Sequence, residues 1–350
     1  MEAGFGVNSV GRRSDGGGPI LISDAASMTT TMNTPFGAAA WRIAVRRAAP
    51  LLCAALLWLP QNAAAQDRGS LNPEPLPPLA HPEDPATPAK ELFGRKIAPA
   101  KMDARTLGFY SKGCLAGGVA LPINGATWQV MRLSRNRNWG HPNLVQFLEQ
   151  LSAKAPTTGW RGLLVGDMSQ PRGGPMRTGH ASHQVGLDAD IWLTPMPDRE
   201  LSRQEREEMS ATMVVAEDRT DVDPKVWTPA HLNVIRAAAK DPQVARIFVN
   251  AAIKKALCRE AGSDRGWLGK VQPWWGHDYH FHVRLICPSD NPECTPQPPR
   301  PADEGCGKEL DHWFTEAVLH PKPSPTPSKP RPGLRMADLP DACRRVLLAP

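Results

Sequence analysis

Two short stretches of the chain gather residues that could do chemistry together. Residues 180–190 read HASHQVGLDAD, and residues 277–282 read HDYHFH. A histidine, a carboxylate seven residues later and a distant His-x-His pair can supply the three ligands of a catalytic zinc site. Such a site leaves a fourth position open for water. The pattern therefore predicts a zinc hydrolase.

Strand periodicity predicts which of these residues bind the metal and which one faces the reacting water. Side chains two positions apart on a strand share one face, so His280 and His282 point the same way if residues 279–286 form a strand. We predict that His183, Asp190 and His282 bind the zinc ion. His280, one pleat away, would then face the reacting water instead of the metal.

The expected chemistry is hydrolysis. Zinc lowers the pKa of a coordinated water to about 7 and polarises the scissile carbonyl. The chain has no His-Glu-x-x-His motif. A neutral histidine, His280, is therefore the best candidate for the base that accepts the proton of the water. His277 and Arg284 could stabilise the oxyanion, although Arg284 could equally be structural.

Apolar periodicity predicts the elements that must position these residues. Strands are expected over residues 109–133 (as hairpins), 162–166, 186–193 and 279–286. Helices are expected over residues 142–154, 228–239, 242–257 and 308–319. Together they fit one α+β domain. In it a small antiparallel sheet carries the zinc site, flanked by helices and by long loops that disulfides pin.

The two ends of the chain differ in composition from the predicted domain. Residues 1–65 read as a leader, with a positive stretch, an apolar core over 48–60 and a small-residue cleavage site near Ala65. The apolar core is too short to span a bilayer, which needs ~20 residues. We therefore expect an exported protein with no stable membrane insertion after cleavage. Translation could begin at Met28 or Met32.

The remaining boundaries follow from proline content. Residues 66–90 are predicted to be a Pro-rich linker, 91–319 the domain that carries the predicted zinc site, and 320–350 a Pro-rich tail. The formal net charge of +6 is modest and is partly carried by the two ends. It does not predict binding to nucleic acid.

Six cysteines remain once Cys53 is removed with the leader. An even number in an exported protein predicts disulfides and leaves their connectivity open. The short spacing between Cys287 and Cys294 suits a local loop closed by a bridge. None of the six lies in a Cys-x-x-Cys pair, so a structural zinc knuckle is not expected.

At these motifs the chain resembles the penicillin-insensitive murein endopeptidases. These are periplasmic zinc peptidases, grouped with lysostaphin-type and D-alanyl-D-alanine-cleaving metallopeptidases. The resemblance covers about residues 90–345. It rests on ELFG at 91–94, GCL at 113–115, RNRNWGHP at 135–142, GHASHQVGLDAD at 179–190, RIFVN at 246–250 and WWGHDYHFHVR at 274–284.

The resemblance implies the same zinc ligands, His183, Asp190 and His282. It also implies that His280 is the general base and that His277 assists it. A further histidine, His180, corresponds to one that lies near the metal in the family, either as an added ligand or as a group behind a ligand.

Three disulfides are implied by the resemblance: Cys114–Cys343, Cys258–Cys306 and Cys287–Cys294. The first would anchor the Pro-rich tail to the domain. The resemblance also implies a possible second metal near Asp218 and Asp221. The alternative for this acidic segment is an ordinary solvated loop.

The implied reaction is hydrolysis of peptidoglycan cross-links between D-alanine and meso-diaminopimelate in stem peptides, in the periplasm. No serine nucleophile takes part, so β-lactams have nothing to acylate. Two alternatives stay open. One is a D,D-carboxypeptidase or dipeptidase of the same metal group, and the other is a wall-binding or zinc-binding protein without turnover.

Overall fold

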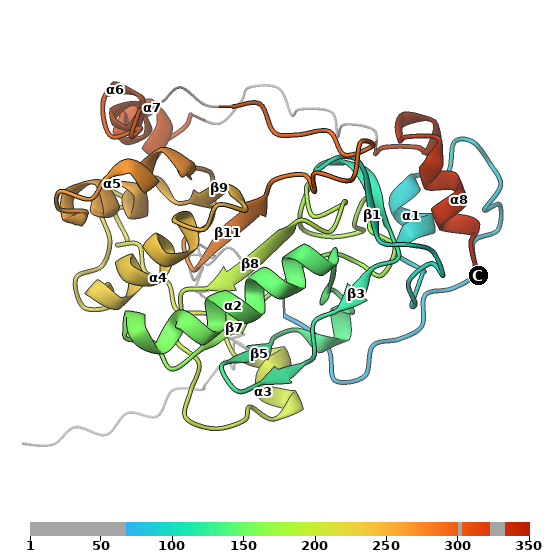
Figure 1. Ribbon diagram of the computed structural model, residues 1–350, viewed down its shortest axis with the longest axis horizontal. Helices are drawn as coiled ribbons and strands as arrows, with labels where there is room; N and C mark the ends of the chain where they lie inside the picture. The colour runs from blue at the N-terminus through green and yellow to red at the C-terminus, as the bar shows by residue number, and fades with distance from the viewer. Residues whose placement is uncertain (1–67, 300–302, 323–332) are drawn as a thin grey trace, which may run out of the picture. The chain divides into compact units, whose positions relative to one another are not determined.

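The computed structural model describes residues 68–299, 303–322 and 333–350, all of which belong to one unit of the chain (Figure 1). The predicted leader over 1–65, with Cys53, lies outside the described residues, as does the Pro-rich segment 323–332. In the part of the chain that is described, no helix is both long and apolar enough to cross a membrane.

A seven-stranded sheet lies at the centre of this unit. In order across the sheet, its strands are β10 (Val271–Pro273), β9 (Val244–Val249), β11 (His280–Leu285), β8 (Asp188–Trp192), β7 (Leu163–Val165), β5 (Trp128–Val130) and β4 (Asn124–Gly125). Two smaller sheets pair β1 (Arg105–Phe109) with β2 (Lys112–Ala116), and β3 (Val119–Ala120) with β6 (Trp139–Gly140).

The predicted α+β class is confirmed, and the sheet is larger than expected. β11 pairs antiparallel with β8 on one side and with β9 on the other. The sheet is nevertheless mixed, because β10 runs parallel to β9 and β5 runs parallel to β7. The antiparallel pair β8–β11 is the part that carries the motif residues.

The described helices are α1 (Ala89–Phe93), α2 (Pro142–Thr158), α3 (Arg203–Glu208), α4 (Pro229–Ala239), α5 (Ala251–Glu260), α6 (Lys308–Asp311), α7 (Glu316–Leu319) and α8 (Ala342–Leu348). The longest, α2, begins after His141, whose ring accepts a hydrogen bond from the backbone of Asn143. It ends at Gly159, whose φ of 96° suits a glycine C-cap.

The helix predicted over residues 242–257 is wrong for its first half. Residues 244–249 form strand β9, and only residues 251–260 form helix α5. Val244, Ile247 and Val249 are buried, and the strand lies between β10 and β11. β-branched residues fit such a buried, pleated position well, and short apolar runs do not distinguish a strand from a helix by spacing alone.

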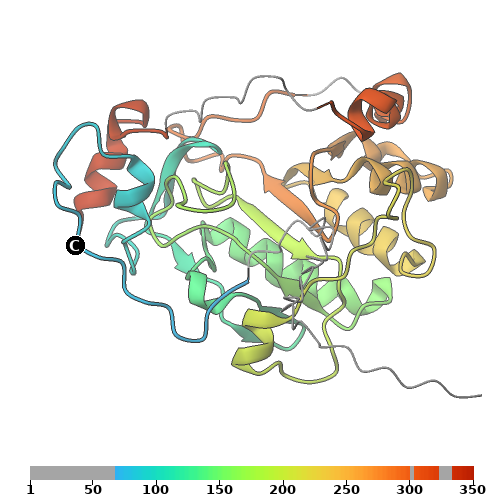
Figure 2. The ribbon, with the colours of Figure 1, turned by 180° about the vertical axis from the view of Figure 1, so that it is seen from behind.

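The two faces of the β8–β11 pair have different partners. Ala189, Ile191, Phe281 and Val283 belong to the main apolar cluster, which also contains buried residues of α2 and α4. The alternate residues of the same strands face the other way, because side chains alternate along a strand. In Figure 1 α2 and α4 lie in front of the sheet, and Figure 2 views the same unit from behind. The helices thus cover one face, and the motif histidines are left on the other.

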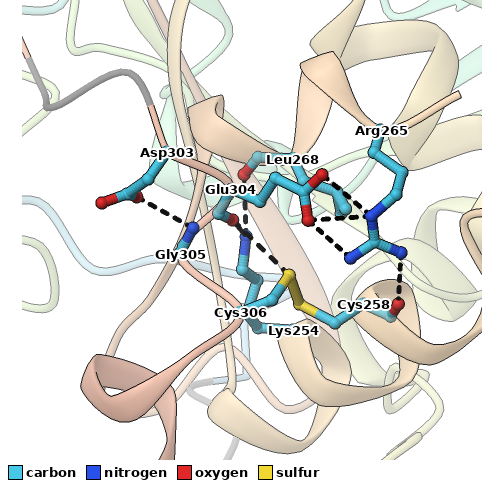
Figure 3. The surroundings of a disulfide bond; sticks show 8 residues. All are labelled: Lys254, Cys258, Arg265, Leu268, Asp303, Glu304, Gly305 and Cys306. Atoms are coloured by element: carbon cyan, nitrogen blue, oxygen red, sulfur yellow. Dashed lines mark hydrogen bonds and ion pairs between the residues drawn. A yellow bond between two sulfur atoms is a disulfide. The ribbon is translucent and has the colours of Figure 1, made fainter.

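Three disulfides join the six cysteines, and their pairs are those implied by the family resemblance. Cys114 in β2 bonds to Cys343 in α8, which packs with α1 and β2 in a small separate apolar cluster. Cys287 bonds to Cys294 across a short loop. The third bridge, Cys258–Cys306, ties α5 to the segment before α6 (Figure 3).

The surroundings of the Cys258–Cys306 bridge are polar and well bonded. Lys254, fully buried in α5, donates from Nζ to the backbone carbonyls of Leu268 and Glu304, and Arg265 pairs with the Glu304 carboxylate (Figure 3). Because the buried ammonium is bonded to these carbonyls, its desolvation is partly compensated. The bridge and these bonds together hold the 303–306 segment against α5.

Candidate metal centre

Strands β8 and β11 bring the two sequence motifs together. Asp190 and His282 are directly opposite each other in the antiparallel register, and His280 is opposite Trp192. His180 and His183 approach from the loop that precedes β8. Three residues of one motif and two of the other, about a hundred residues apart in the chain, therefore meet at one face of the sheet.

Left-handed backbone positions shape the loops at the centre. His183 has a φ of 66° and His277 a φ of 58°, a region that non-glycine residues rarely adopt. Gly186, with a φ of 72°, turns the chain into β8. Its α-carbon is so closely packed that an added Cβ would lie 2.7 Å from Leu115 Cδ2 and 2.9 Å from the backbone nitrogen of His141. Such positions concentrate at functional sites.

Four imidazole rings converge on the Asp190 carboxylate. Oδ1 lies 3.5 Å from His183 Nε2, 3.2 Å from His282 Nδ1 and 3.6 Å from His280 Nε2, while Oδ2 lies 3.4 Å from His180 Nε2. The potential ligand atoms of His180, His183 and Asp190 all lie within 4.8 Å of one another. This arrangement can hold a metal ion.

The centre also contains buried polar atoms that lack hydrogen-bond partners among the described residues. They are both ring nitrogens of His183, Asp190 Oδ1 and His280 Nδ1. Such atoms are costly to bury unless something binds them. Imidazole nitrogens and a carboxylate oxygen are the donor set that zinc prefers in catalytic sites. The residues present therefore fit a zinc ion.

Hydrogen bonding orients His282 for this role. Its Nε2 lies 3.0 Å from Oδ1 of Asp188, a carboxylate that is completely buried. Because the carboxylate accepts, Nε2 carries a proton, and Nδ1 is the ring atom that faces Asp190. A carboxylate behind a histidine is the usual support of a metal-binding imidazole.

Burial and proximity set the charges at the centre. Burial opposes ionisation of Asp190, but the nearby His280 and His180 outweigh it and hold its pKa well below the ordinary range. Burial lowers the pKa of His280 to about 4, and burial together with His280 lowers that of His277 to about 3. Both rings are therefore neutral at pH 7 and can accept a proton. His277 Nδ1 lies 2.9 Å from the Trp275 carbonyl, to which it donates, so Nε2 is its accepting atom.

Asp167 is a residue of this region to which the sequence motifs assigned no role. It follows β7, is buried, and its Oδ2 lies 3.1 Å from His180 Nε2. The same oxygen accepts hydrogen bonds from Arg135 and Arg137 at 3.0 Å and 2.8 Å. The available signal was its position directly after the predicted buried strand 162–166, because a buried carboxylate needs a charged or hydrogen-bonding partner.

Asp218 and Asp221 lie in a separate loop with other partners. Asp218 accepts hydrogen bonds from the backbone and hydroxyl of Thr220. Asp221 pairs with Arg259 at 2.7 Å and with Lys255 at 3.7 Å. The second metal near these residues stays a prediction.

Two cavities flank the centre. The smaller, about 150 Å³, is bounded by His180, Asp190 and His280, and the larger, about 550 Å³, by His180, His277 and His282. A ligand that lies in both cavities would cross the histidine–aspartate cluster. The fold and the centre thus define an α+β protein whose buried histidine–aspartate cluster can hold a metal ion and adjoins two cavities.

Comparisons with known proteins specify the family. A family model described as penicillin-insensitive murein endopeptidase matches residues 106–348. The chain is 47% identical to the Haemophilus influenzae protein of that name over 249 residues, which are 71% of this chain and 84% of the relative. It is 44% identical over 265 residues to the one from Klebsiella pneumoniae (75% and 91%), and 42% identical over 262 residues to the one from Yersinia enterocolitica (75% and 90%). The chain belongs to this family and is a peptidase.

Proposed function

We propose that this protein is a zinc-dependent endopeptidase that hydrolyses D-alanyl-meso-diaminopimelyl cross-links of peptidoglycan and is insensitive to penicillin. The observation that carries the zinc dependence is the set of buried, unpartnered donor atoms around Asp190. The family membership and the printed names of the relatives support murein as the substrate.

The proposed division of labour assigns the metal to His183, Asp190 and His282, with His180 beside them. When bound, zinc acidifies a water and polarises the scissile carbonyl. His280, neutral at pH 7, accepts a proton from the attacking water and returns it to the leaving amine. His277, whose ring centroid is 4.7 Å from that of His280, assists through Nε2.

Substitutions test this division by reading metal content and turnover separately. His183→Ala and Asp190→Ala are expected to lose bound zinc and activity together. His280→Ala is expected to lower kcat by about 10²–10⁴-fold, the range for loss of a general base, while zinc content stays near one equivalent. Loss of zinc from His280→Ala would show that His280 is a ligand and that the division is wrong.

Digestion of purified sacculi tests the reaction itself. Zinc-loaded protein should convert cross-linked dimers to monomers, penicillin should have no effect, and a chelator should stop the conversion. Loss of terminal D-alanine with dimers intact would instead indicate a D,D-carboxypeptidase. No product of either kind would favour a wall-binding or zinc-binding protein.

We propose that the protein acts in the periplasm after export and cleavage near Ala65. Three disulfides support an oxidising compartment. Cell fractionation followed by N-terminal sequencing checks this proposal. We expect a periplasmic protein that begins at Gln66, and a cytoplasmic protein with its leader intact would contradict it.

A further inference from the structure

The smaller cavity beside the metal centre is lined by arginines. Arg132, Arg135 and Arg137 all contribute to its wall, next to His280 and Asp190. All three come from the segment that follows β5, the first of them only two residues past the end of the strand. Three guanidinium groups within one cavity of about 150 Å³ make a cationic wall directly beside the centre.

Charge in the cavity stays positive after its own ion pairs are counted. The lining carboxylates are Asp167 and Asp190, against three arginines. Asp167 Oδ2 is shared by Arg135 and Arg137, so one negative charge faces two positive ones. Asp190 is turned toward the histidines of the metal centre. The wall therefore carries an excess of one positive charge even before a metal cation is added, and it favours an anionic ligand.

The guanidinium groups are held in place by the protein. Arg132 donates to the backbone carbonyls of Arg206 and Met209, and its guanidinium carbon lies 5.0 Å from the ring centre of Trp192. Arg137 donates both to Asp167 and to the carbonyl of Thr178. Because these side chains are already ordered, a ligand would lose little affinity to their immobilisation. The side chain of Arg135, 17% exposed against 8% for Arg137, is the more open of the two that pair with Asp167.

We propose that this cavity binds the carboxylate that neighbours the scissile amide, with Arg135 as its contact. This inference rests on the proposed function. In a D-alanyl-meso-diaminopimelyl cross-link, the carbon that carries the amide nitrogen also bears a free carboxylate. That group is two bonds from the leaving nitrogen, so it falls beside the centre when the amide lies at His280. Guanidinium groups pair with carboxylates through charge-assisted hydrogen bonds.

The other cavity has a different chemistry, which orients the substrate. It is lined by the aromatic rings of Phe109, Phe248 and Trp274, and its one arginine, Arg284, is paired with the buried Asp188. A peptide with its carboxylate among the arginines would extend its acyl side over these rings. The arginine cavity would thus distinguish this cross-link from amides that lack a neighbouring negative charge.

The test compares two cross-linked dimers that differ only in this group. One carries the free carboxylate next to the scissile amide, and the other carries a carboxamide. We expect zinc-loaded wild-type protein to cleave the free acid with a kcat/KM about tenfold or more above that of the amide, the size of effect that a charged hydrogen bond supports. Arg135→Gln should reduce this ratio toward one, and Arg135→Lys should retain part of it.

The matched control is Arg161→Gln, which removes an exposed arginine that pairs with Asp198 and lines neither of the two cavities. It should keep the wild-type ratio. The ratio of kcat/KM for the two dimers, measured with one protein preparation, does not depend on the fraction of folded protein. The comparison of the two dimers with wild-type protein needs no variant. Equal cleavage of both dimers by wild-type protein, or an unchanged ratio in Arg135→Gln, would overturn the carboxylate site. Failure of wild-type protein to cleave either dimer would instead contradict the proposed function.

Discussion

At the scale of single residues, Asp188 connects the two halves of the centre. Its Oδ1 lies 3.0 Å from His282 Nε2 and accepts from Arg284 Nε at 2.8 Å, while Oδ2 accepts from the backbone nitrogen of His183 at 3.0 Å. One buried carboxylate thus orients the ring of one proposed ligand and the backbone of another. Burial opposes its ionisation, but Arg284 and His282 hold the pKa of Asp188 well below its ordinary value. It is therefore charged whenever the protein is folded near neutral pH.

Asp188→Asn should weaken zinc binding about 10–100-fold, the usual effect of removing a carboxylate behind a histidine ligand. The amide keeps the shape but loses the charge that favours Nε2–H and a lone pair on Nδ1 of His282. Competition with a chromophoric chelator measures the affinity. Asp198→Asn, on an aspartate whose side chain is 80% exposed, is the control. Unchanged affinity in a folded Asp188→Asn protein would contradict the role.

At the scale of elements, the site depends on how the loop over 179–187 enters β8. The loop carries His180 and His183, and β8 carries Asp190. Gly186 lets the chain turn between them, and its backbone carbonyl accepts from the nitrogen of His141 at the start of α2. The strand then pairs with β11, which places Asp190 opposite His282. The position of the turn therefore sets how far His183 lies from these two residues.

Gly186→Ala should lower the free energy of unfolding by about 2 kcal/mol or more. A left-handed backbone alone costs a non-glycine residue about 1–2 kcal/mol, and the new methyl group would also overlap Leu115 and the backbone of His141. Urea unfolding followed by circular dichroism measures the change. Gly266→Ala is the matched control, because an added Cβ there meets nothing within 4 Å. Equal stability of the two variants would show that the turn tolerates a side chain.

At the scale of the whole described unit, disulfides join segments that are distant in sequence. Cys114–Cys343 spans 229 residues and holds α8 against β2, in an apolar cluster apart from the main core. Arg172 adds hydrogen bonds to the carbonyls of Val346 and Leu347 in α8. Cys287–Cys294 spans only 7 residues. The two bridges therefore constrain the unfolded chain to very different extents.

Replacing Cys114 and Cys343 with serine should destabilise the protein more than replacing Cys287 and Cys294. For loops of these lengths, the loop-entropy relation gives a difference of roughly 3 kcal/mol. Guanidinium unfolding of the two double variants, with the other bridges intact, measures it. If the short bridge proved to be the more stabilising of the two, chain entropy would not explain the contribution of these disulfides.

Much of the site and fold class followed from local sequence. The motif residues were identifiable because histidine and aspartate at these spacings have few reasons to cluster other than metal chemistry, and the strand parity of His280 and His282 needs only the pleat of a strand. The helix over 142–154 was predictable from apolar spacing, and α2 spans 142–158. Residues 244–249, expected to be helical, form a strand. Apolar spacing could not predict this, because the strand is stabilised by β10 and β11, which come from other parts of the chain.

The sequence by itself determined which residue types could bind a metal, which strands could carry them, and that six cysteines outside the predicted leader could form disulfides. Only the tertiary structure decided that four imidazoles meet at one carboxylate, that Asp188 and Asp167 stand behind them, and that three arginines line the neighbouring cavity. These contacts join residues far apart in the chain. Their distances are set by the pairing of β8 with β11 and by the packing of loops around that pair. Neither can be predicted from the spacing of residues along the chain.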